Sequence, residues 1–406
     1  MPLTGKWWNL TVLAVAELLA MTLWFSASAV VPQLVLEWTL SAGLQAWMTM
    51  SVQIGFVVGA LLSAWFNLAD RISERMLFAV CAVLGAGCNL VIAGFSVGPE
   101  LALLFRFLTG VTLAGVYPPG MKLMTTWCKE DRGLGIGILV GALTVGSATP
   151  HLLNALPIFG DGGMPPWRSV LFATSLLACV AGSMVWACVR VGPYHQKGAV
   201  FDWKMATRGL SHQPTRLANF GYFGHMWELY AMWVWVPRCL IDSYQAAGLS
   251  VASSRIAGFG TVAIGGVGCL LAGKLADRWG RTTITIASLL ISGLCCLLAG
   301  WLYQSPILLT GLCLIWGFAV VADSAQFSAA ISELADSRYV GTALSIQTSL
   351  GFLLTMVSIY LVGILQANYG WENAFFVLAI GPVFGIWSMW RLRQLPESVR
   401  MASGNR

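Results

Sequence analysis

Charged side chains are scarce in this sequence. Asp, Glu, Lys and Arg together account for only 10% of its 406 residues, whereas soluble globular domains contain about 25%. Hydrophobic residues make up 57% of the chain, and 19 residues are tryptophan. This composition excludes a water-soluble domain and is typical of a protein that crosses a membrane many times.

Metal-binding and catalytic patterns are also lacking in the sequence. The 4 histidines are scattered, and the 10 cysteines show neither the spacing of metal ligands nor that of a secreted disulfide framework. An intramembrane enzyme needs such a catalytic cluster. We therefore expect no enzymatic activity, no catalytic residues, no bound metal and no cofactor.

The alternation of polar and apolar residues that marks membrane-spanning strands is missing as well. Instead, the chain contains continuous apolar runs that are long enough for a helix to cross a hydrocarbon core of roughly 30 Å. Twelve such spans are predicted, near residues 9–31, 43–65, 77–97, 101–122, 134–156, 168–189, 217–238, 254–273, 283–303, 306–330, 340–363 and 371–390. The expected fold class is an all-α membrane protein.

The basic residues indicate how these spans are oriented. With a cytoplasmic amino terminus, all but four of the 23 Lys and Arg residues fall in cytoplasmic loops or tails, as the positive-inside rule requires. The four exceptions are Arg106, Arg168, Arg238 and Arg255. The formal charge of +6 therefore reflects topology and does not indicate nucleic-acid binding. We expect a multi-pass protein in the lipid bilayer of the bacterial cytoplasmic (inner) membrane, with both termini cytoplasmic.

Two stretches of sequence recur. The segment AELLAMTLWF, which contains Glu17, shares the spacing of its Glu, Leu, Ala, Met and Trp with WELYAMWVWV, which contains Glu228. LADR occurs at residues 68–71 and again at residues 275–278. Because six spans, an even number, separate the copies, the two halves cross the membrane in the same sense, as parallel repeats. This recurrence also argues against the alternative that the first span is a cleaved signal peptide.

The longest hydrophilic segment lies between the two repeats and is interpreted as a linker. The predicted organisation is an amino-terminal six-helix bundle at residues 1–190, a cytoplasmic linker at 191–216, a carboxy-terminal six-helix bundle at 217–392 and a cytoplasmic tail at 393–406. In transporters built from such repeats, the substrate site lies between the halves near the middle of the membrane.

The stretch GKLADRWGRTT, from Gly273 to Thr283, resembles the signature loop of the major facilitator superfamily, whose pattern is Gly-x-Leu-Ala-Asp-Arg-x-Gly-Arg. It lies between the predicted spans eight and nine, where that family carries it. The sequence RFLTG, which contains Arg106 and Gly110, is similar to the arginine-bearing motif of the family's fourth span. The resemblance implies the twelve-helix fold of a bacterial transporter of this family.

In that family the signature loops latch the cytoplasmic ends of the two halves. The residues that this resemblance assigns to the latch are Asp70, Arg71, Gly273, Asp277, Arg278, Gly280 and Arg281. The first copy departs from the pattern, because Phe66 and Ser73 replace glycines and Glu74 replaces an arginine. We therefore expect the latch function chiefly of the second copy.

Ionisable residues inside the predicted spans point to a transport site. Glu17, Arg106, Glu228 and Asp323 lie on spans one, four, seven and ten, which line the central cavity in the architecture that the resemblance implies. His225 precedes Glu228 by three residues and shares its helix face. Such groups are costly within a membrane, and desolvated carboxylic acids exchange protons near neutral pH. We predict that these five residues take part in proton coupling or substrate binding.

Four aromatic residues are predicted to line the same cavity. Trp24 and Trp235 follow the two glutamates by seven residues, on the same helical stripe. Tyr117 and Tyr230 lie on spans four and seven. Aromatic rings at these positions can stack on an organic substrate or contact a cation.

Together these features predict a secondary transporter that moves a small organic solute, with organic anions among the candidates, by alternating access and with proton coupling. A second class stays open, because three acids and one arginine also suit a proton-coupled efflux antiporter for drugs or other cations. A transporter-like sensor that does not transport is a third alternative. The expected partners are the substrate and protons, and the expected oligomeric state is a monomer.

Reporter fusions test the predicted topology. If the basic residues set the orientation, green fluorescent protein fused after Arg208 or after Arg406 is expected to fluoresce, because both positions are cytoplasmic. Alkaline phosphatase inserted near Asp161 is expected to be active in the periplasm. A carboxy-terminal fusion with the periplasmic signature would contradict the twelve-span arrangement.

Overall fold

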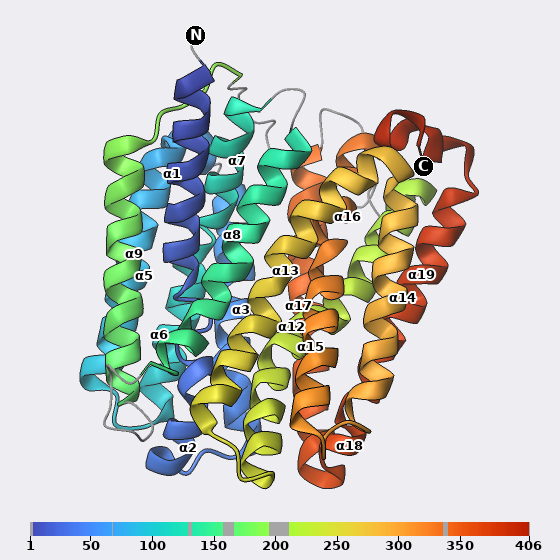
Figure 1. The fold of residues 1–406 in the computed structure, drawn as a ribbon. Coiled ribbons are helices and arrows are strands. Elements are labelled where there is room, and N and C mark those ends of the chain that lie inside the picture. Colours follow the sequence, from blue (N-terminus) through green and yellow to red (C-terminus); the bar gives the residue numbers. More distant parts are fainter. Residues whose placement is uncertain are drawn as a thin grey trace. The chain divides into compact units, whose positions relative to one another are not determined.

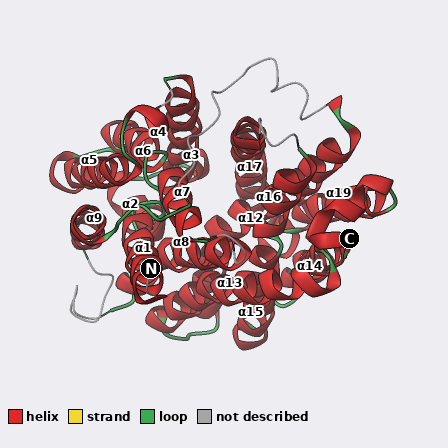
Figure 2. Ribbon diagram, turned by 90° about the horizontal axis from the view of Figure 1, so that it is seen from above, coloured by secondary structure: helices red, strands yellow, loops and turns green. Residues whose placement is uncertain are grey.

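The computed structural model describes residues 3–66, 68–128, 132–156, 166–194, 211–335 and 340–405. Every regular element within these ranges is a helix (Figure 2). Ten helical stretches among them are long and apolar enough to cross a membrane. The two remaining predicted spans lie in α1 (Leu3–Met21) and α12 (Gln213–Ala246), which carry more polar and aromatic residues. The chain therefore has the predicted all-α, twelve-helix membrane fold.

The chain divides into two compact units, residues 1–197 with 249–263 and residues 198–248 with 264–406. In the first unit, the helices besides α1 are α2 (Val31–Trp38), α3 (Ala42–Trp65), α4 (Leu68–Arg71), α5 (Glu74–Phe95), α6 (Pro99–Leu113), α7 (Tyr117–Trp127), α8 (Arg132–Leu153) and α9 (Trp167–Cys188). Within it, α5 packs on α9 (Figure 1), and α3 packs on α6 (Figure 2).

The second unit contains α12 and the elements that follow it. These are most of α13 (Val251–Trp279), α14 (Arg281–Ala299), α15 (Pro306–Ala322), α16 (Ser324–Leu334), α17 (Val340–Tyr369), α18 (Trp371–Ala374), the 3-10 turn η3 (Phe376–Ala379), α19 (Ile380–Arg393) and the 3-10 segment η4 (Pro396–Gly404). Helix α12 packs against α17 and α19, and α14 packs against α15 and α19. The predicted linker falls mostly on residues 195–210, outside the described ranges.

The first span is interrupted, whereas the sequence predicted one helix over residues 9–31. Helix α1 ends at Met21, and turns lead through the 3-10 turn η1 (Ser28–Val30) to α2. Hydroxyl groups cap the interruption, because Thr22 donates a hydrogen bond to the Leu19 carbonyl and Ser26 donates one to the Leu23 carbonyl. Short polar side chains compete with the helix for its own backbone groups in this way.

Spans four and ten are also broken, and at related places. Span four consists of α6 and α7, separated by a turn at residues 114–116, and span ten consists of α15 and α16, separated at Asp323. The last span is likewise divided, since α18 and η3 precede α19, although the sequence predicted one helix over residues 371–390. Non-helical backbone within a membrane fold is tolerated where protein or a wet cavity surrounds it.

Helix α12 is longer than the predicted span at residues 217–238. It has 34 residues and continues through Pro237, which lies inside the helix. Most of its side chains are buried, including five of its tryptophan and tyrosine residues, Tyr222, Tyr230, Trp233, Trp235 and Tyr244. The helix is therefore held by packing on several faces, which explains its low mean hydropathy compared with lipid-facing helices.

Glycine permits the closest helix contact in the first unit. A Cβ atom at Gly110 of α6 would overlap the backbone carbonyl of Val52 of α3, and one at Gly55 of α3 would overlap the carbonyl of Phe107 of α6. Backbone atoms cannot move aside as a flexible side chain can. Small residues at such crossings let membrane helices approach closely.

Gly110→Ala tests this packing. The added methyl group must separate α3 from α6, and overpacking of this kind typically costs about 1–3 kcal/mol, so the melting temperature of the purified protein is expected to fall. Gly94→Ala is the matched control, since a Cβ atom at Gly94 of α5 meets nothing within 4 Å. The control is expected to melt at or above the parent temperature, and equal melting of the two variants would contradict the close crossing.

Candidate functional site

Glu17 is an isolated acid in the first unit. It lies near the carboxyl end of α1 and is fully buried, at 0% exposure. Neither of its carboxyl oxygens has a hydrogen-bond partner among the described residues. Gly120 of α7 leaves room for it, because a Cβ atom there would lie 2.6 Å from the Glu17 Oε2 atom. The helices thus enclose this acid without providing a donor for it.

Glu228 has the same local sequence spacing but a different environment. Its Oε1 accepts hydrogen bonds from Trp316 Nε1 at 2.6 Å and from Cys296 Sγ at 3.1 Å. Its Oε2 accepts one from Ser292 Oγ at 2.9 Å. These donors come from α14 and α15, so Glu228 ties α12 to both helices. Satisfied buried polar groups of this kind fix the packing of neighbouring elements.

His225 pairs with Asp323, not with Glu228. Its Nδ1 atom lies 2.8 Å from Asp323 Oδ1, and both side chains are only 1% exposed. The sequence led us to expect His225 as the titratable neighbour of Glu228. Asp323, which lies at the break between α15 and α16, contacts His225 instead. The ring centroids of His225 and Phe327 are 5.5 Å apart.

Arg106 clamps the interruption of the first span. This fully buried guanidinium donates hydrogen bonds to the carbonyls of Leu23 (2.8 Å), Met48 (3.2 Å) and Trp24, and to the Ser26 hydroxyl (3.1 Å). Three of these acceptors follow the carboxyl end of α1, where a cation is electrostatically favoured, and the fourth, the Met48 carbonyl, lies in α3. The observed contacts therefore describe a structural role. The predicted part of Arg106 in coupling or substrate binding stays a prediction.

A polar network extends from this clamp. Ser26 Oγ donates to Asn89 Oδ1 at 2.9 Å, and Asn89 Nδ2 donates to the Leu171 carbonyl at 3.0 Å and to the hydroxyls of Thr174 and Ser175 of α9 at 3.0 and 3.1 Å. The network joins the turn after α1 to α5 and α9 inside the first bundle. Because it surrounds the segment that follows α1, it helps to hold Glu17 in place.

The four aromatic residues predicted to line a cavity occur in packed surroundings. The ring centroids of Trp24 and Phe56 are 5.1 Å apart, and Trp235 Nε1 donates to the Ile359 carbonyl at 2.9 Å. The ring centroids of Tyr230 and Phe352 are 5.0 Å apart. Tyr117 begins α7 and is half-buried. Their substrate contacts remain a prediction.

The second signature loop is held by an ion pair that the sequence pattern did not reveal. Arg281 forms a bidentate contact with Glu333 of α16, from Nε to Oε2 at 2.7 Å and from Nη2 to Oε1 at 2.6 Å, and its Nη1 donates to Gln326 Oε1 at 2.8 Å. Asp277 is exposed, and its Oδ1 lies 3.7 Å from Arg281. Gly280 adopts φ 91°, a backbone conformation that favours glycine.

The remaining latch residues are less constrained. Gly273 lies inside α13, and a Cβ atom added there would lie 4.0 Å from Nε2 of Gln326. Arg278 is exposed near the end of α13. In the first unit, Arg71 is exposed at the end of α4. The side chain of Asp70 lies outside the described part of the structure.

The first unit replaces the Arg281–Glu333 pair with one of reversed polarity. Glu74 begins α5, as Arg281 begins α14, and its Oε1 lies 2.8 Å from Nζ of Lys122 in α7. Ser73, which stands where the pattern has glycine, caps α5 by accepting a hydrogen bond from the Met76 backbone N–H at 3.3 Å. The degenerate loop therefore retains an ion pair and a helix cap.

Arg255, one of the four basic residues outside the cytoplasmic loops, belongs to a further buried polar cluster that the sequence did not predict. The residue is 4% exposed, and its Nη1 donates to the Asn154 carbonyl at 2.6 Å. Asn154 also accepts from Gln33 Nε2 at 2.7 Å, and its own amide donates to the Ala29 carbonyl. Within the described ranges, Nε and Nη2 of Arg255 have no partner. Arg255 and Asn154 are 101 residues apart in the sequence, so their contact arises only from folding.

The predicted site residues thus fall into separate groups. His225 and Asp323 are brought together, Glu228 is bound by donors of its own unit, and Arg106 is bound by backbone carbonyls. In the described part of the chain, Glu17 is the one predicted acid that is buried with neither a hydrogen-bond partner nor an ion-pair partner, because Asp323 contacts His225. Among the described residues, no cluster of His, Cys, Asp and Glu is arranged to hold a metal ion.

The sequence is similar to those of known membrane transporters. A family model of the Major Facilitator Superfamily matches residues 13–320 and 218–405. The chain is 23% identical to the benzoate transport protein of Acinetobacter baylyi, in an alignment that covers 68% of this chain but only 66% of that protein. It is 26% identical to the multidrug resistance protein MdtG of Escherichia fergusonii over 88% of this chain and 87% of that protein.

A solved structure supports the fold. The crystal structure of the D-xylose-proton symporter superposes with a TM-score of 0.76, covering 98% of this chain and 99% of that one at 16% identity. The helices and buried ionisable groups define a multi-pass α-helical membrane protein. The chain belongs to the Major Facilitator Superfamily.

A charge-swap experiment tests the reversed ion pair. Glu74→Lys or Lys122→Glu alone is expected to destabilise the protein by about 1–3 kcal/mol, because each places like charges together at a largely buried position. The double variant restores opposite charges and is expected to recover most of the melting temperature. The exposed Glu37–Arg168 pair, with atoms 3.8 Å apart, serves as the comparison and is expected to couple by less than about 1 kcal/mol. Additive losses at Glu74 and Lys122 would contradict the pairing.

Proposed function

We propose that the protein is a proton-coupled transporter of small organic acids that works by alternating access, as a monomer in the bacterial cytoplasmic membrane with both termini cytoplasmic. The observation that carries the proposal is the isolation of Glu17, which is fully buried and has no hydrogen-bond partner among the described residues. Its predicted counterpart Glu228 is satisfied by three donors. This contrast assigns the two acids different roles.

The isolation of Glu17 suits a proton carrier. An ionised carboxylate buried without a partner costs far more free energy than a neutral acid in the same place. When a conformational change admits water, that cost is removed and the proton can leave. A side chain whose charge is governed by access to water is therefore able to couple proton movement to the conformation of the protein.

Glu228 is less suited to that task. Each of its oxygens already accepts at least one hydrogen bond, and these bonds persist only while Ser292, Cys296 and Trp316 stay in place. A proton on this carboxyl group would compete with those donors. We therefore assign Glu228 to holding α12 against α14 and α15, where its disturbance would weaken substrate binding indirectly.

An organic acid is favoured as the substrate class for two reasons. Arg255 offers a buried positive charge with two donor atoms that the described residues leave unused, and a guanidinium binds carboxylates well. A relative of the chain is a benzoate transport protein, and benzoate is a carboxylate. The resemblance to a multidrug resistance protein keeps efflux of drugs or cations by proton antiport as the second candidate, since a buried unpaired acid also suits exchange of a proton for a cation.

Transport in proteoliposomes tests the proposal, with radiolabelled benzoate as the first probe. One proton per substrate allows a pH difference of about one unit to drive roughly tenfold accumulation, because both correspond to about 1.4 kcal/mol. The parent is expected to accumulate benzoate when the outside is acidic. Glu17→Gln, which mimics the neutral acid, is expected to lose accumulation but to retain exchange of internal for external benzoate.

The control is Glu100→Gln, which alters an exposed acid at the start of α6 in the same unit. It is expected to accumulate benzoate like the parent. Accumulation by Glu17→Gln at the parental level would show that this acid is not the proton carrier. Proton release on addition of a cationic drug, with no benzoate exchange, would support the antiporter instead, and the lack of any exchange or counterflow would support a sensor.

A further inference from the structure

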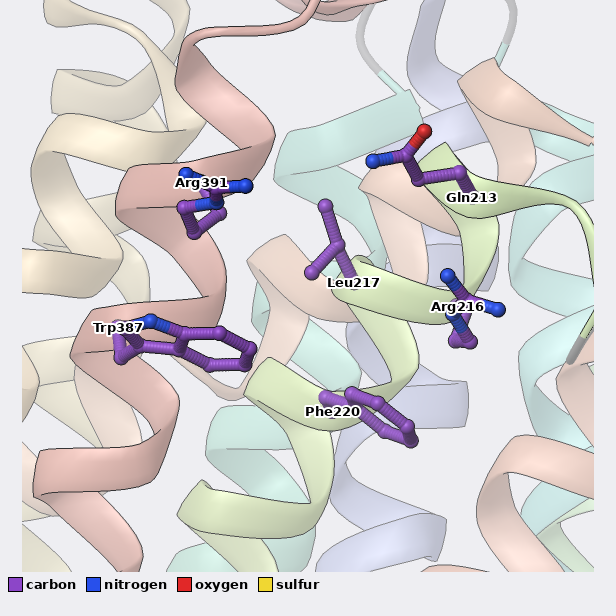
Figure 3. A pocket seen from close by; sticks show the side chains of 6 residues that line it. All are labelled: Gln213, Arg216, Leu217, Phe220, Trp387 and Arg391. Carbon is purple, nitrogen blue, oxygen red and sulfur yellow. The ribbon is translucent and has the colours of Figure 1, made fainter.

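A pocket opens between the start of α12 and the end of α19, both in the second unit. Its volume is about 420 Å³, and its lining residues are Gln213, Arg216, Leu217, Phe220, Trp387 and Arg391. Figure 3 shows the first four along α12 and the last two on α19, with the indole of Trp387 extending toward α12. The pocket contains none of the residues that the proposed transport function uses.

The pocket is positively charged without a visible counterion. Within the described ranges, the side chains of Arg216 and Arg391 form no ion pair and no hydrogen bond, in contrast with nearby Arg393, which donates to the Thr283 hydroxyl. Helix α12 begins at Gln213, and the side chain of its cap residue His212 accepts no hydrogen bond from the backbone N–H groups of the first turn. The unpaired N–H groups and the positive end of the helix dipole add to the two arginine charges.

An exposed apolar stripe on α19 leads to this pocket. Ile380, Val383, Phe384 and Trp387 are between 40% and 67% exposed. Their spacing of three and four residues places them on one helix face, and Arg391 follows Trp387 on that face. The stripe from Ile380 to Arg391 is about 16 Å long at 1.5 Å per residue, which matches half of a hydrocarbon core of roughly 30 Å.

These features together indicate an amphiphilic ligand. An anionic group would lie between two guanidinium groups and a helix amino terminus, and an apolar chain would lie along the exposed side chains of α19. Tryptophan beside arginine at the end of such a stripe is typical of the membrane boundary. Basic pockets between membrane helices bind the headgroups of anionic lipids.

We propose that this pocket binds the phosphate group of an anionic phospholipid from the adjacent leaflet, with its acyl chains along α19. The phosphate diester accepts hydrogen bonds from Arg216 and Arg391, and the Gln213 amide faces the same pocket. A soluble phosphate shares this headgroup chemistry, but it would leave the apolar stripe unused. The lipid is therefore the occupant that the pocket and the stripe fit together.

Lipid binding can be measured on the whole protein in neutral detergent by native mass spectrometry and by thermal shift. Phosphatidylglycerol is expected to remain bound and to raise the melting temperature more than phosphatidylcholine. The double variant Arg216→Gln/Arg391→Gln is expected to bind phosphatidylglycerol about tenfold or more weakly, because it loses both charges. Arg400→Gln, which alters an exposed arginine of η4 outside the pocket, is expected to bind it like the parent.

Soluble glycerol 3-phosphate and inorganic phosphate distinguish the two sources of the anion. Neither is expected to raise the melting temperature at concentrations where phosphatidylglycerol does. If they stabilise the parent equally well, or if the double variant retains parental affinity for phosphatidylglycerol, the proposal is overturned. Should the double variant fail to fold, Arg391→Gln alone is expected to give an intermediate loss, and parental affinity in that variant would overturn the proposal as well.

Discussion

The arrangement of the first bundle depends on one buried cation. Arg106 has no exposed surface, and a charge of this kind is tolerated inside apolar packing only when hydrogen bonds replace its water. Its bonds reach the carbonyls of Leu23 and Trp24, which α1 leaves free by ending at Met21. The break in the helix and the arginine therefore require each other. Through Ser26 the same group reaches Asn89 of α5 and then Thr174 of α9, so Arg106 links its own helix α6 to both of them.

The two acids of the repeated segment differ because their surroundings differ. Glu17 lies one turn before the clamped break and faces Gly120, which provides space but no donor. Glu228 lies in an uninterrupted helix and meets Trp316, Cys296 and Ser292. A duplicated sequence has thus acquired one satisfied carboxyl group and one unsatisfied carboxyl group. The free energy of ionisation of the unsatisfied group depends far more strongly on access to water.

The signature loops show how a motif can change while its physical task is retained. In the second unit Arg281 is held by Glu333, and in the first unit Glu74 is held by Lys122. The attraction between opposite charges does not depend on which helix carries which sign. Ser73 likewise replaces a glycine and caps its helix with a hydroxyl group. A sequence motif that requires particular residue types misses both substitutions, because it specifies which residue occupies a position and not which contacts that residue makes.

The sequence by itself determined the membrane class, the all-α fold, the two repeats and the presence of buried acids, because long apolar runs and the cost of charge in a membrane are local properties of the chain. It also placed the second signature loop, whose glycine at position 280 is required by a positive φ angle. Only the tertiary structure decided which residues contact the charged side chains. Glu333, Lys122 and Asn154 lie 52, 48 and 101 residues from the charged groups that they meet, and no local pattern reports such pairings. The pairing of His225 with Asp323 in place of Glu228 has the same cause, because contact between side chains far apart in sequence follows from helix packing and not from helical spacing alone.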